Sequence, residues 1–243
     1  MDFILLDLDS HEIFDVANIG WASACSPASP LRSADHETLP DLDELWNATK
    51  TFIWDHKLSM NPCIHPTHAQ LNGFLKAHGR GPSPRDTMVP AFSMCTTQLH
   101  ADILTVAVEM WTDDVGPDPE WKDKPDDRLL WRGSNTGMYF DFDNGWNVSQ
   151  RVRLVKTANE QTGKVRVLKP IDKPSEAVGD PELIEQADLN DLFMDIAFSR
   201  SPLQCREEIC KQVAQEYEFR EAQTWIQANE YKYILDVSLS VCL

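Results

Sequence analysis

The amino-acid sequence predicts an α/β fold in which short buried strands alternate with amphipathic helices. The stretch Leu129–Gly137 begins with apolar residues and ends in a polar turn framed by glycines, which is typical of a strand leaving a sheet. Helical patterns follow at 182–197 and 206–219, and a strongly apolar, β-like run occupies Tyr231–Val237. These observations place the second half of the chain in the α/β class.

The composition limits the class of partner. The chain has 243 residues, is 42% hydrophobic and carries a formal net charge of -17. Its apolar content suffices for one large or two small domains, whereas its charge argues against binding nucleic acid or an anionic membrane surface. No apolar run approaches the roughly 20 residues of a membrane-spanning helix. The N-terminal segment lacks the basic residues of a signal peptide, so no targeting signal is expected in this chain.

The pattern of apolar and polar residues predicts the remaining elements. Before residue 126 we expect a strand at 1–13, a loop at 22–40, a helix at Asp41–Leu58, a strand end at Val89–Ser93, a helix at Leu99–Trp111 and an acidic loop at 112–128. After the central turn we expect strands at 151–155 and 164–168 and a linker at 169–182.

The turn that follows the predicted strand carries groups suited to an anion. Arg132 offers a planar fork of donors, and Ser134 and Thr136 add hydroxyl groups. Gly133 and Gly137 have no Cβ, so a ligand can approach the backbone closely. The alternative is a strand end whose arginine pairs with one of the many carboxylates, because such turns are common.

Six cysteines are present, and none has the spacing of a zinc site. Cys205 and Cys210 are close enough in sequence to form a bridge in an oxidising compartment; small buried thiols are the alternative. Glycosylation triplets at Asn47 and Asn147 favour the secretory pathway only weakly.

Three Asp-x-Asp pairs invite a comparison with transferases that use Mn²⁺. They are Asp7/Asp9, Asp41/Asp43 and Asp141/Asp143. In a chain this acidic the tripeptide is expected by chance, so we predict no metal site. A Mn²⁺-dependent enzyme built on Asp141 and Asp143 remains a weaker alternative.

Several segments, taken together, resemble glycosyltransferase family 90. Trp131–Gly137 resembles the family's Trp-Arg-Gly-Ser-x-Thr-Gly signature. Three further segments occur in the family's order: Pro90–Ser93 followed by Asp102–Leu104, Asp195–Phe198 leading into two cysteines, and Tyr231–Leu235. The resemblance covers residues 85–237 and is closest to fungal members of a family that contains capsule-associated xylosyltransferases and protein O-glucosyltransferases.

The resemblance implies a GT-B-like enzyme made of two Rossmann-like halves, each incomplete here. Residues 1–125 would form the acceptor side, and residues 126–243 would begin the half that binds the nucleotide sugar. Such an enzyme transfers xylose or glucose from a UDP-sugar to a hydroxyl of a glycan or glycoprotein, without a metal or other cofactor. It works in the lumen of the endoplasmic reticulum or Golgi.

The resemblance also assigns roles to residues. The donor would be held by Arg132, Gly133, Ser134 and Thr136. Animal members have another donor-binding arginine where this chain has Phe140, and Arg153 or Arg151 would substitute for it. Asp9 lies where the family has its catalytic base. Phe92, Ser93 and Asp102 would line the cleft near the acceptor.

An alternative to catalysis follows from family segments with no counterpart here. Family members have a further N-terminal stretch, and they continue after the Tyr-Lys-Tyr run to an arginine that grips the diphosphate. Losing that arginine would remove on the order of several kcal/mol of transition-state stabilisation. The chain would then be an inactive, truncated remnant that acts at most as a glycan- or partner-binding module.

Overall fold

The structure is a computed structural model. It describes residues 21–34, 53, 55–73, 90, 92–93, 103–106, 115–168, 171–175, 177 and 179–237. The predicted strand at 1–13, most of the predicted helix Asp41–Leu58, and the site residues Asp9 and Asp102 lie outside these ranges.

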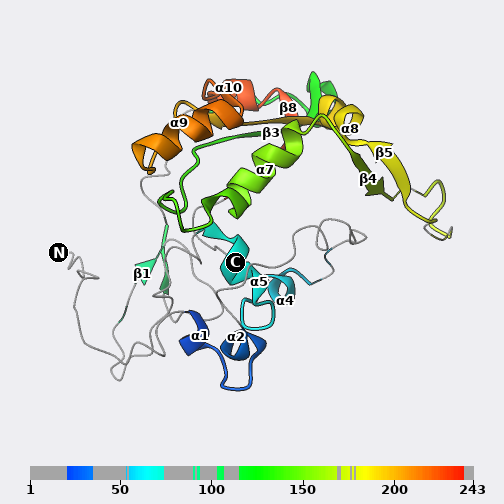
Figure 1. The fold of residues 1–243 in the computed structure, drawn as a ribbon. Coiled ribbons are helices and arrows are strands. Elements are labelled where there is room, and N and C mark those ends of the chain that lie inside the picture. The colour runs from blue at the N-terminus through cyan, green and yellow to red at the C-terminus, as the bar shows by residue number, and fades with distance from the viewer. Residues whose placement is uncertain are drawn as a thin grey trace.

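A parallel four-stranded sheet is the centre of the second half of the chain (Figure 1). Its strands are β3 (Asp126–Gly133), β6 (Met194–Ser199), β7 (Phe219–Arg220) and β8 (Tyr231–Ile234). The order across the sheet is β7-β6-β3-β8, so the chain moves outward from β3 and then returns to its other side. This is the order of the first four strands of a doubly wound α/β sheet.

Helices connect the strands. They are α7 (Gln150–Asn159), α8 (Gln186–Phe193), α9 (Glu207–Glu216) and α10 (Trp225–Ala228), together with short 3-10 turns η3 (Trp121–Asp123) and η4 (Trp146–Val148). An antiparallel hairpin of β4 (Lys164–Val167) and β5 (Glu182–Glu185) lies between α7 and α8 and extends away from the sheet (Figure 1). The α/β class expected from the sequence is therefore confirmed.

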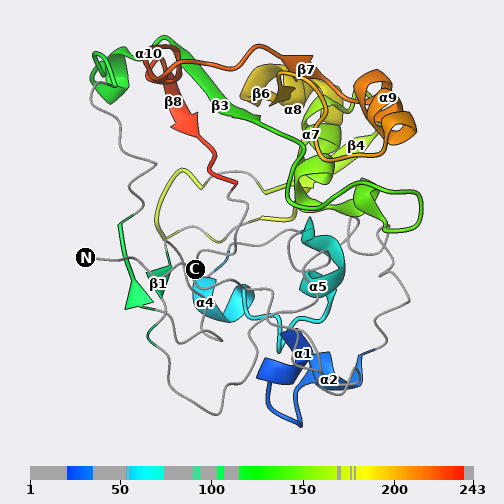
Figure 2. The same cartoon turned by 90° about the vertical axis from the view of Figure 1, so that its left-hand side faces the viewer.

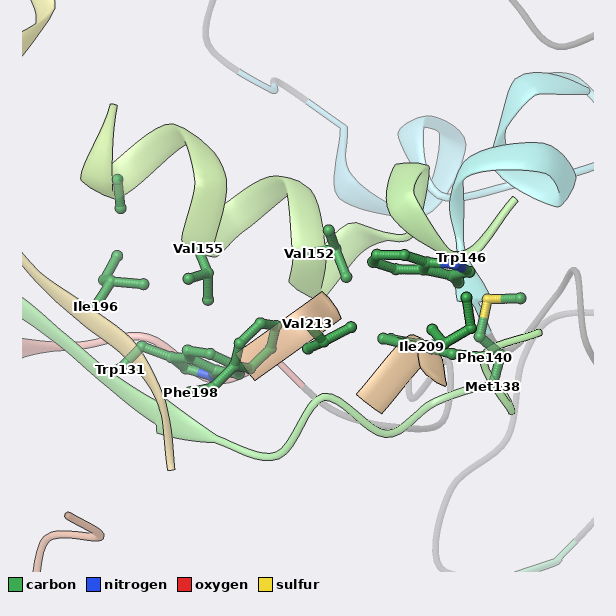
Figure 3. Packing of buried hydrophobic residues seen from close by; sticks show 11 residues of the cluster. Trp131, Met138, Phe140, Trp146, Val152, Val155, Ile196, Phe198, Ile209 and Val213 are labelled. Atoms are coloured by element: carbon green, nitrogen blue, oxygen red, sulfur yellow. The ribbon is translucent and has the colours of Figure 1, made fainter. Parts of the chain in front are cut away.

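The main hydrophobic core lies between one face of this sheet and helices α7 and α9 (Figure 3). Trp131 of β3 and Phe198 of β6 meet edge to face, with their ring centroids 6.0 Å apart. Val152 and Val155 of α7 and Val213 of α9 are almost completely buried beside them. Each fully buried apolar side chain of this kind contributes about 1.5–3 kcal/mol to stability.

The described elements before residue 126 are short. They are helices α1 (Trp21–Ala24), α2 (Pro30–Ser33), α4 (His56–Ser59) and α5 (Thr67–Leu71) and the two-stranded parallel ribbon of β1 (Phe92–Ser93) and β2 (Ile103–Leu104). A disulfide between Cys25 and Cys63 joins the α1–α2 region to the segment between α4 and α5.

Two helix predictions in this region are wrong where the structure can test them. Ile103–Leu104 lies inside the predicted helix Leu99–Trp111 but forms β2; both residues are exposed, so no apolar helical face packs there. Asp55 lies inside the predicted helix Asp41–Leu58 but is extended. Its carboxylate caps α4 by accepting a 2.9 Å hydrogen bond from the backbone of Leu58, which is a common role for aspartate.

Two predictions in the second half are also corrected. The predicted strand at 151–155 is the start of α7. Val152 and Val155 enter the same core, whereas in a strand residues three apart point to opposite faces. The predicted helix at 182–197 divides into β5, α8 and β6, because Met194–Ser199 pairs with β3 and is buried on both faces, as a central parallel strand requires.

Other predictions in this half are confirmed. β3 ends at the polar turn, β4 lies within 164–168, α9 lies within 206–219, and β8 begins at Tyr231. Of the two alternatives left open for Cys205 and Cys210, the disulfide is the one present. Among the described residues, no helix is both long and apolar enough to cross a bilayer.

Candidate functional site

The carboxyl ends of β3 and β8 form the candidate site. These strands are neighbours in the sheet although their paired positions Asp126 and Tyr231 are 105 residues apart in the sequence, and Figure 2 shows them side by side. The chain leaves β3 in one direction and returns to β8 on the other side, so this edge is a topological switch point. In open α/β sheets, ligands bind outside the carboxyl ends of the strands at such a point.

Three polar side chains meet at this edge: Ser134, Thr136 and Arg151, which we call the Ser134 cradle. The hydroxyl oxygens of Ser134 and Thr136 are 2.5 Å apart. Nη1 of Arg151 donates to the Ser134 carbonyl at 3.0 Å and reaches both hydroxyl oxygens at 3.4 Å. Nη2 donates to the carbonyl of Val237, just beyond β8, at 2.6 Å. Arg151 therefore ties the turn after β3 to the segment after β8.

Arg151 is a buried cation without a paired carboxylate. Only 7% of the residue is exposed, and its Nε has no hydrogen-bond partner. Its bonded acceptors are carbonyl and hydroxyl oxygens, and no described carboxylate forms an ion pair with it. Burial lowers the pKa of Arg151, while the negative charge of Asp236 acts in the opposite direction. An unpaired buried charge is costly, so an anion placed here gains from relieving that cost.

The N-terminus of helix α7 also favours an anion at this edge. Arg151 lies in the first turn of the ten-residue helix α7, whose N-terminus carries a partial positive charge. The N-cap residue, Ser149, makes no side-chain capping bond. Ser134 and Thr136 are partly exposed, whereas Arg151, which contacts both hydroxyl oxygens, is buried.

Arg132 points to the other face of the sheet. Trp131 faces the core, and neighbouring residues of a strand alternate between faces. Nη2 of Arg132 forms an ion pair with the Asp195 carboxylate at 2.5 Å, and Nη1 donates to the Asp195 carbonyl at 2.7 Å. Its side chain is only 8% exposed. The alternative prediction, in which this strand-end arginine pairs with a carboxylate, is confirmed. Both Nη groups of Arg132 are therefore already engaged.

The ion pair belongs to a larger group, which we call the Asp195 cluster: Arg128, Arg132, Asp195, Arg220 and Tyr231. Arg220 pairs with Asp195 at 2.6 Å, the Tyr231 hydroxyl donates to it, and Arg128 lies 3.8 Å away. Burial acts to raise the pKa of Asp195, but the hydrogen bonds from Tyr231 and Arg132 outweigh it, so the pKa is lowered. Asp195 is therefore a charged, fully partnered carboxylate.

Gly133 and Phe140 have packing roles. A Cβ on Gly133 would lie 2.5 Å from Cζ2 of Trp131, so the ring of this tryptophan leaves no room for a side chain there. Phe140, where animal members of the resembled family have an arginine, is completely buried. It stacks on Trp146 with 5.1 Å between ring centroids (Figure 3).

The structure does not bring Arg153 to the cradle. Residues two apart on a helix point about 200° apart, so Arg151 and Arg153 leave α7 in different directions. Nε of Arg153 donates to the Val148 carbonyl at 2.9 Å. The residue lines a cavity of about 1300 Å³ on the side of α7 away from the sheet, whose wall also includes His68, Leu71, Lys156 and Tyr217. Of the two arginines proposed as substitutes, Arg151 is the one beside Ser134.

The predicted cleft residues Phe92 and Ser93 lie in β1, which is separate from the four-stranded sheet and lies apart from it in both ribbon views (Figures 1 and 2). The side chain of Phe92 is exposed. Asp102, the third residue of this group, is outside the described ranges, as is Asp9.

The Asp141/Asp143 pair is not assembled as a metal site. Asp141 is bound by Arg206, whose Nε lies 2.8 Å from its carboxylate, and this hydrogen bond lowers the pKa of Asp141. Within the described ranges, no three histidine, cysteine, aspartate or glutamate side chains are grouped to hold a metal ion.

Comparison with known proteins found no relative of this chain. No family model, curated protein or solved structure matches this chain. The motifs quoted above therefore carry the family resemblance alone.

Sequence reasoning gave Arg151 only as a substitute and missed the Val237 carbonyl. One local signal pointed to Arg151: it follows Ser149 in a segment that begins a helix once the spacing of Val152 and Val155 is recognised. Val237 had no such signal, because its contact with Arg151 spans 86 residues of sequence.

Proposed function

We propose that the Ser134 cradle binds the diphosphate of a UDP-sugar and that the chain is a family 90-like glycosyltransferase. The observation that carries the proposal is the buried, unpaired charge of Arg151, placed at the switch point of a parallel sheet beside two hydroxyls. A diphosphate supplies the missing negative charge, and the Ser134 and Thr136 hydroxyls supply directed hydrogen bonds.

The proposed reaction transfers xylose or glucose to a hydroxyl of a glycan or glycoprotein. In this scheme the cradle stabilises the negative charge that develops on the departing UDP, which is the main electrostatic demand of the reaction. Asp9 deprotonates the acceptor, and Phe92, Ser93 and Asp102 line the acceptor side. Arg132 acts indirectly, by fixing the end of β3 through Asp195.

The architecture and compartment belong to the same proposal. Residues 1–125 and 126–243 correspond to the two halves of a GT-B-like enzyme, and the strand order of the second half supports this assignment. The disulfides Cys25–Cys63 and Cys205–Cys210 support an oxidising compartment such as the lumen of the secretory pathway.

Calorimetric titration with UDP tests the proposal. We expect Arg151→Met to weaken UDP binding at least about tenfold, because it removes a charge-assisted interaction, and Ser134→Ala to weaken it less. Arg153→Met is the matched control: it removes a cation from the same helix, on the side facing the cavity, and leaves UDP affinity unchanged. Equal affinity in the wild type and Arg151→Met, or no binding by the wild type at millimolar UDP, would overturn the proposal.

A second function, that of a non-catalytic binding module, is favoured by the state of Arg132. Its Nη donors are held by Asp195 and the Trp131 carbonyl, so this signature arginine is not free to follow charge development on a donor. Incubation with UDP-xylose and UDP-glucose separates the two functions. Release of UDP supports the transferase, whereas tight binding without release supports the module.

A further inference from the structure

Asn135 separates the two hydroxyl residues of the cradle and is itself 99% buried, with a relative exposure of 1%. Its side-chain amide makes two reciprocal hydrogen bonds with the backbone of Leu203, in the loop between β6 and α9. Nδ2 donates to the Leu203 carbonyl at 2.7 Å, and Oδ1 accepts from the Leu203 N–H at 2.8 Å. Both polar atoms of the buried Asn135 side chain are therefore engaged with Leu203, which fixes the turn to this loop.

Phe140 makes a second connection to the same loop. Its N–H donates to the Gln204 carbonyl at 2.8 Å, and its carbonyl accepts from the Arg206 N–H at 3.1 Å. The segment 135–140 is thus attached to residues 203–206 at both ends. We call these four hydrogen bonds the Asn135 clamp. The backbone of Thr136 and Gly137 lies between its two attachment points.

The loop that receives the clamp is held in an unusual shape. Arg200 and Gln204 have positive φ angles of 67° and 51°, a conformation that non-glycine residues adopt only when the surroundings fix it. The disulfide between Cys205 and Cys210 supplies such a constraint, since it ties the end of the loop to the first turn of α9. Both cysteines are partly exposed, so a thiol can reach the bond.

We propose that Asn135 is a positioning residue for the cradle, and that the Cys205–Cys210 disulfide makes the order of the cradle depend on redox conditions. A dithiol reductant transfers two electrons and two protons to this disulfide; the S–S bond breaks, two thiols form, and the dithiol becomes a cyclic disulfide. The loop then loses its covalent constraint, and Ser134 and Thr136 lose their fixed positions relative to Arg151. The effect on ligand affinity rests on the proposed function, but the effect on cradle order does not.

Hydrogen–deuterium exchange of the 134–140 segment tests the clamp without any ligand. We expect Asn135→Ala to lower its protection at least about tenfold through the loss of two buried hydrogen bonds. The matched control is Asn159→Ala, since Asn159 also makes two side-chain hydrogen bonds with backbone, donating to the carbonyls of Val155 and Ile196 at the other end of α7. Asn135→Ala protection equal to that of the control would overturn the proposal.

Asn135→Asp supplies a pH profile that a merely structural residue would not show. One carboxylate oxygen still accepts from the Leu203 N–H, but the other faces the Leu203 carbonyl and needs a proton to bind it. Burial raises the pKa of such an aspartate, so protection factors and UDP affinity recover as the pH falls from about 8 to about 5. Asn159→Asp does not change either quantity at the cradle over this range. A flat profile for Asn135→Asp would contradict the assignment.

Dithiothreitol tests the redox part. We expect it to lower 134–140 protection and UDP affinity several-fold in the wild type, and to have no further effect in the double variant Cys205→Ser/Cys210→Ser, which is already loosened. The Cys25→Ser/Cys63→Ser variant retains the full response. An unchanged response in the Cys205→Ser/Cys210→Ser variant would refute the role of this disulfide. If protection changes as expected but the wild type binds no UDP, the clamp stands and the proposed function fails.

Discussion

Arg132 and Arg151 are both buried arginines close to the carboxyl end of β3, yet their surroundings differ in one respect. Arg132 lies in the Asp195 cluster, where a carboxylate neutralises it. Arg151 lies in the Ser134 cradle, where its hydrogen bonds go to carbonyl and hydroxyl oxygens and its guanidinium lies 5.9 Å from the centre of the Trp131 ring. In both side chains Nε lacks a hydrogen-bond partner, but only Arg132 forms an ion pair that balances its charge.

The composition makes this difference informative. The chain has 39 acidic and 22 basic residues, so carboxylates are plentiful. A buried cation without an acidic partner is therefore not explained by a shortage of acids. Under the proposed function, charge balance distinguishes the ligand-binding arginine from the structural one better than membership of the sequence motif does, because Arg132 belongs to the motif and Arg151 does not.

The largest expected effect is on folding stability. Asp195→Asn leaves Arg132 as an unpaired buried charge and should lower the free energy of unfolding by about 3–5 kcal/mol. Arg151→Met breaks no ion pair but removes hydrogen bonds to the Ser134 and Val237 carbonyls, so in the absence of anions it should cost less, about 1–3 kcal/mol. Urea unfolding monitored by tryptophan fluorescence measures both. Equal losses in the two variants would remove the distinction between the two regions.

The second effect is ligand-dependent stabilisation. Pyrophosphate at 100 times its dissociation constant should raise the free energy of unfolding of the wild type by about 2.7 kcal/mol, as mass action requires. Arg151→Met should show little of this increase at the same concentration. Thermal unfolding with and without pyrophosphate measures the difference, and sodium chloride at matched ionic strength controls for screening. Stabilisation of both proteins to the same extent would place the anion elsewhere.

A third prediction concerns the strand end that both regions share. Gly133→Ala puts a methyl group against the buried ring of Trp131 and should cost about 1–3 kcal/mol of stability. Gly179→Ala is the control, since nothing lies within 4 Å of a Cβ at that position and its φ is not in the left-handed region. Thermal unfolding compares the two variants. A neutral Gly133→Ala would contradict the packing role of this glycine.

The smallest effect is the pH dependence of the Asp195 cluster. The pKa of Asp195 is lower in the folded chain than in the unfolded chain, so as the pH falls the unfolded state takes up its proton first. The stabilisation is complete above about pH 4, near the ordinary aspartate pKa, and is lost as the pH falls through the lower folded-state value. Urea unfolding across this range should show that the free energy of unfolding falls less steeply with decreasing pH in Asp195→Asn than in the wild type. The same pH dependence of the free energy of unfolding in the two proteins would contradict the lowered pKa of Asp195.

Local patterns in the sequence predicted the parts of the fold that depend on local chemistry. The strand that ends at Gly133, the helix within 206–219 and the Cys205–Cys210 bridge each follow from a short run of residues. The start of α7 was mispredicted because alternating Arg and Val residues fit a strand as well as a helix, and only the position of the core decides between them.

The candidate site was only partly predictable for a similar reason. Ser134 and Thr136 lie two residues apart, so their meeting is a local matter. The partner of Arg132 is 63 residues away, and which of the chain's 39 acidic residues would take that place depends on the register of β3 against β6. The arginine that meets the hydroxyls likewise depends on where α7 crosses the sheet.

The bond from Arg151 to the Val237 carbonyl also has a consequence for folding. It joins α7, which precedes β8 in the sequence, to backbone that reaches its place only after β8 has paired with β3. Without this last strand Arg151 lacks one of its acceptors. If the cradle binds an anion as proposed, the anion therefore favours molecules whose sheet is complete over partly folded ones.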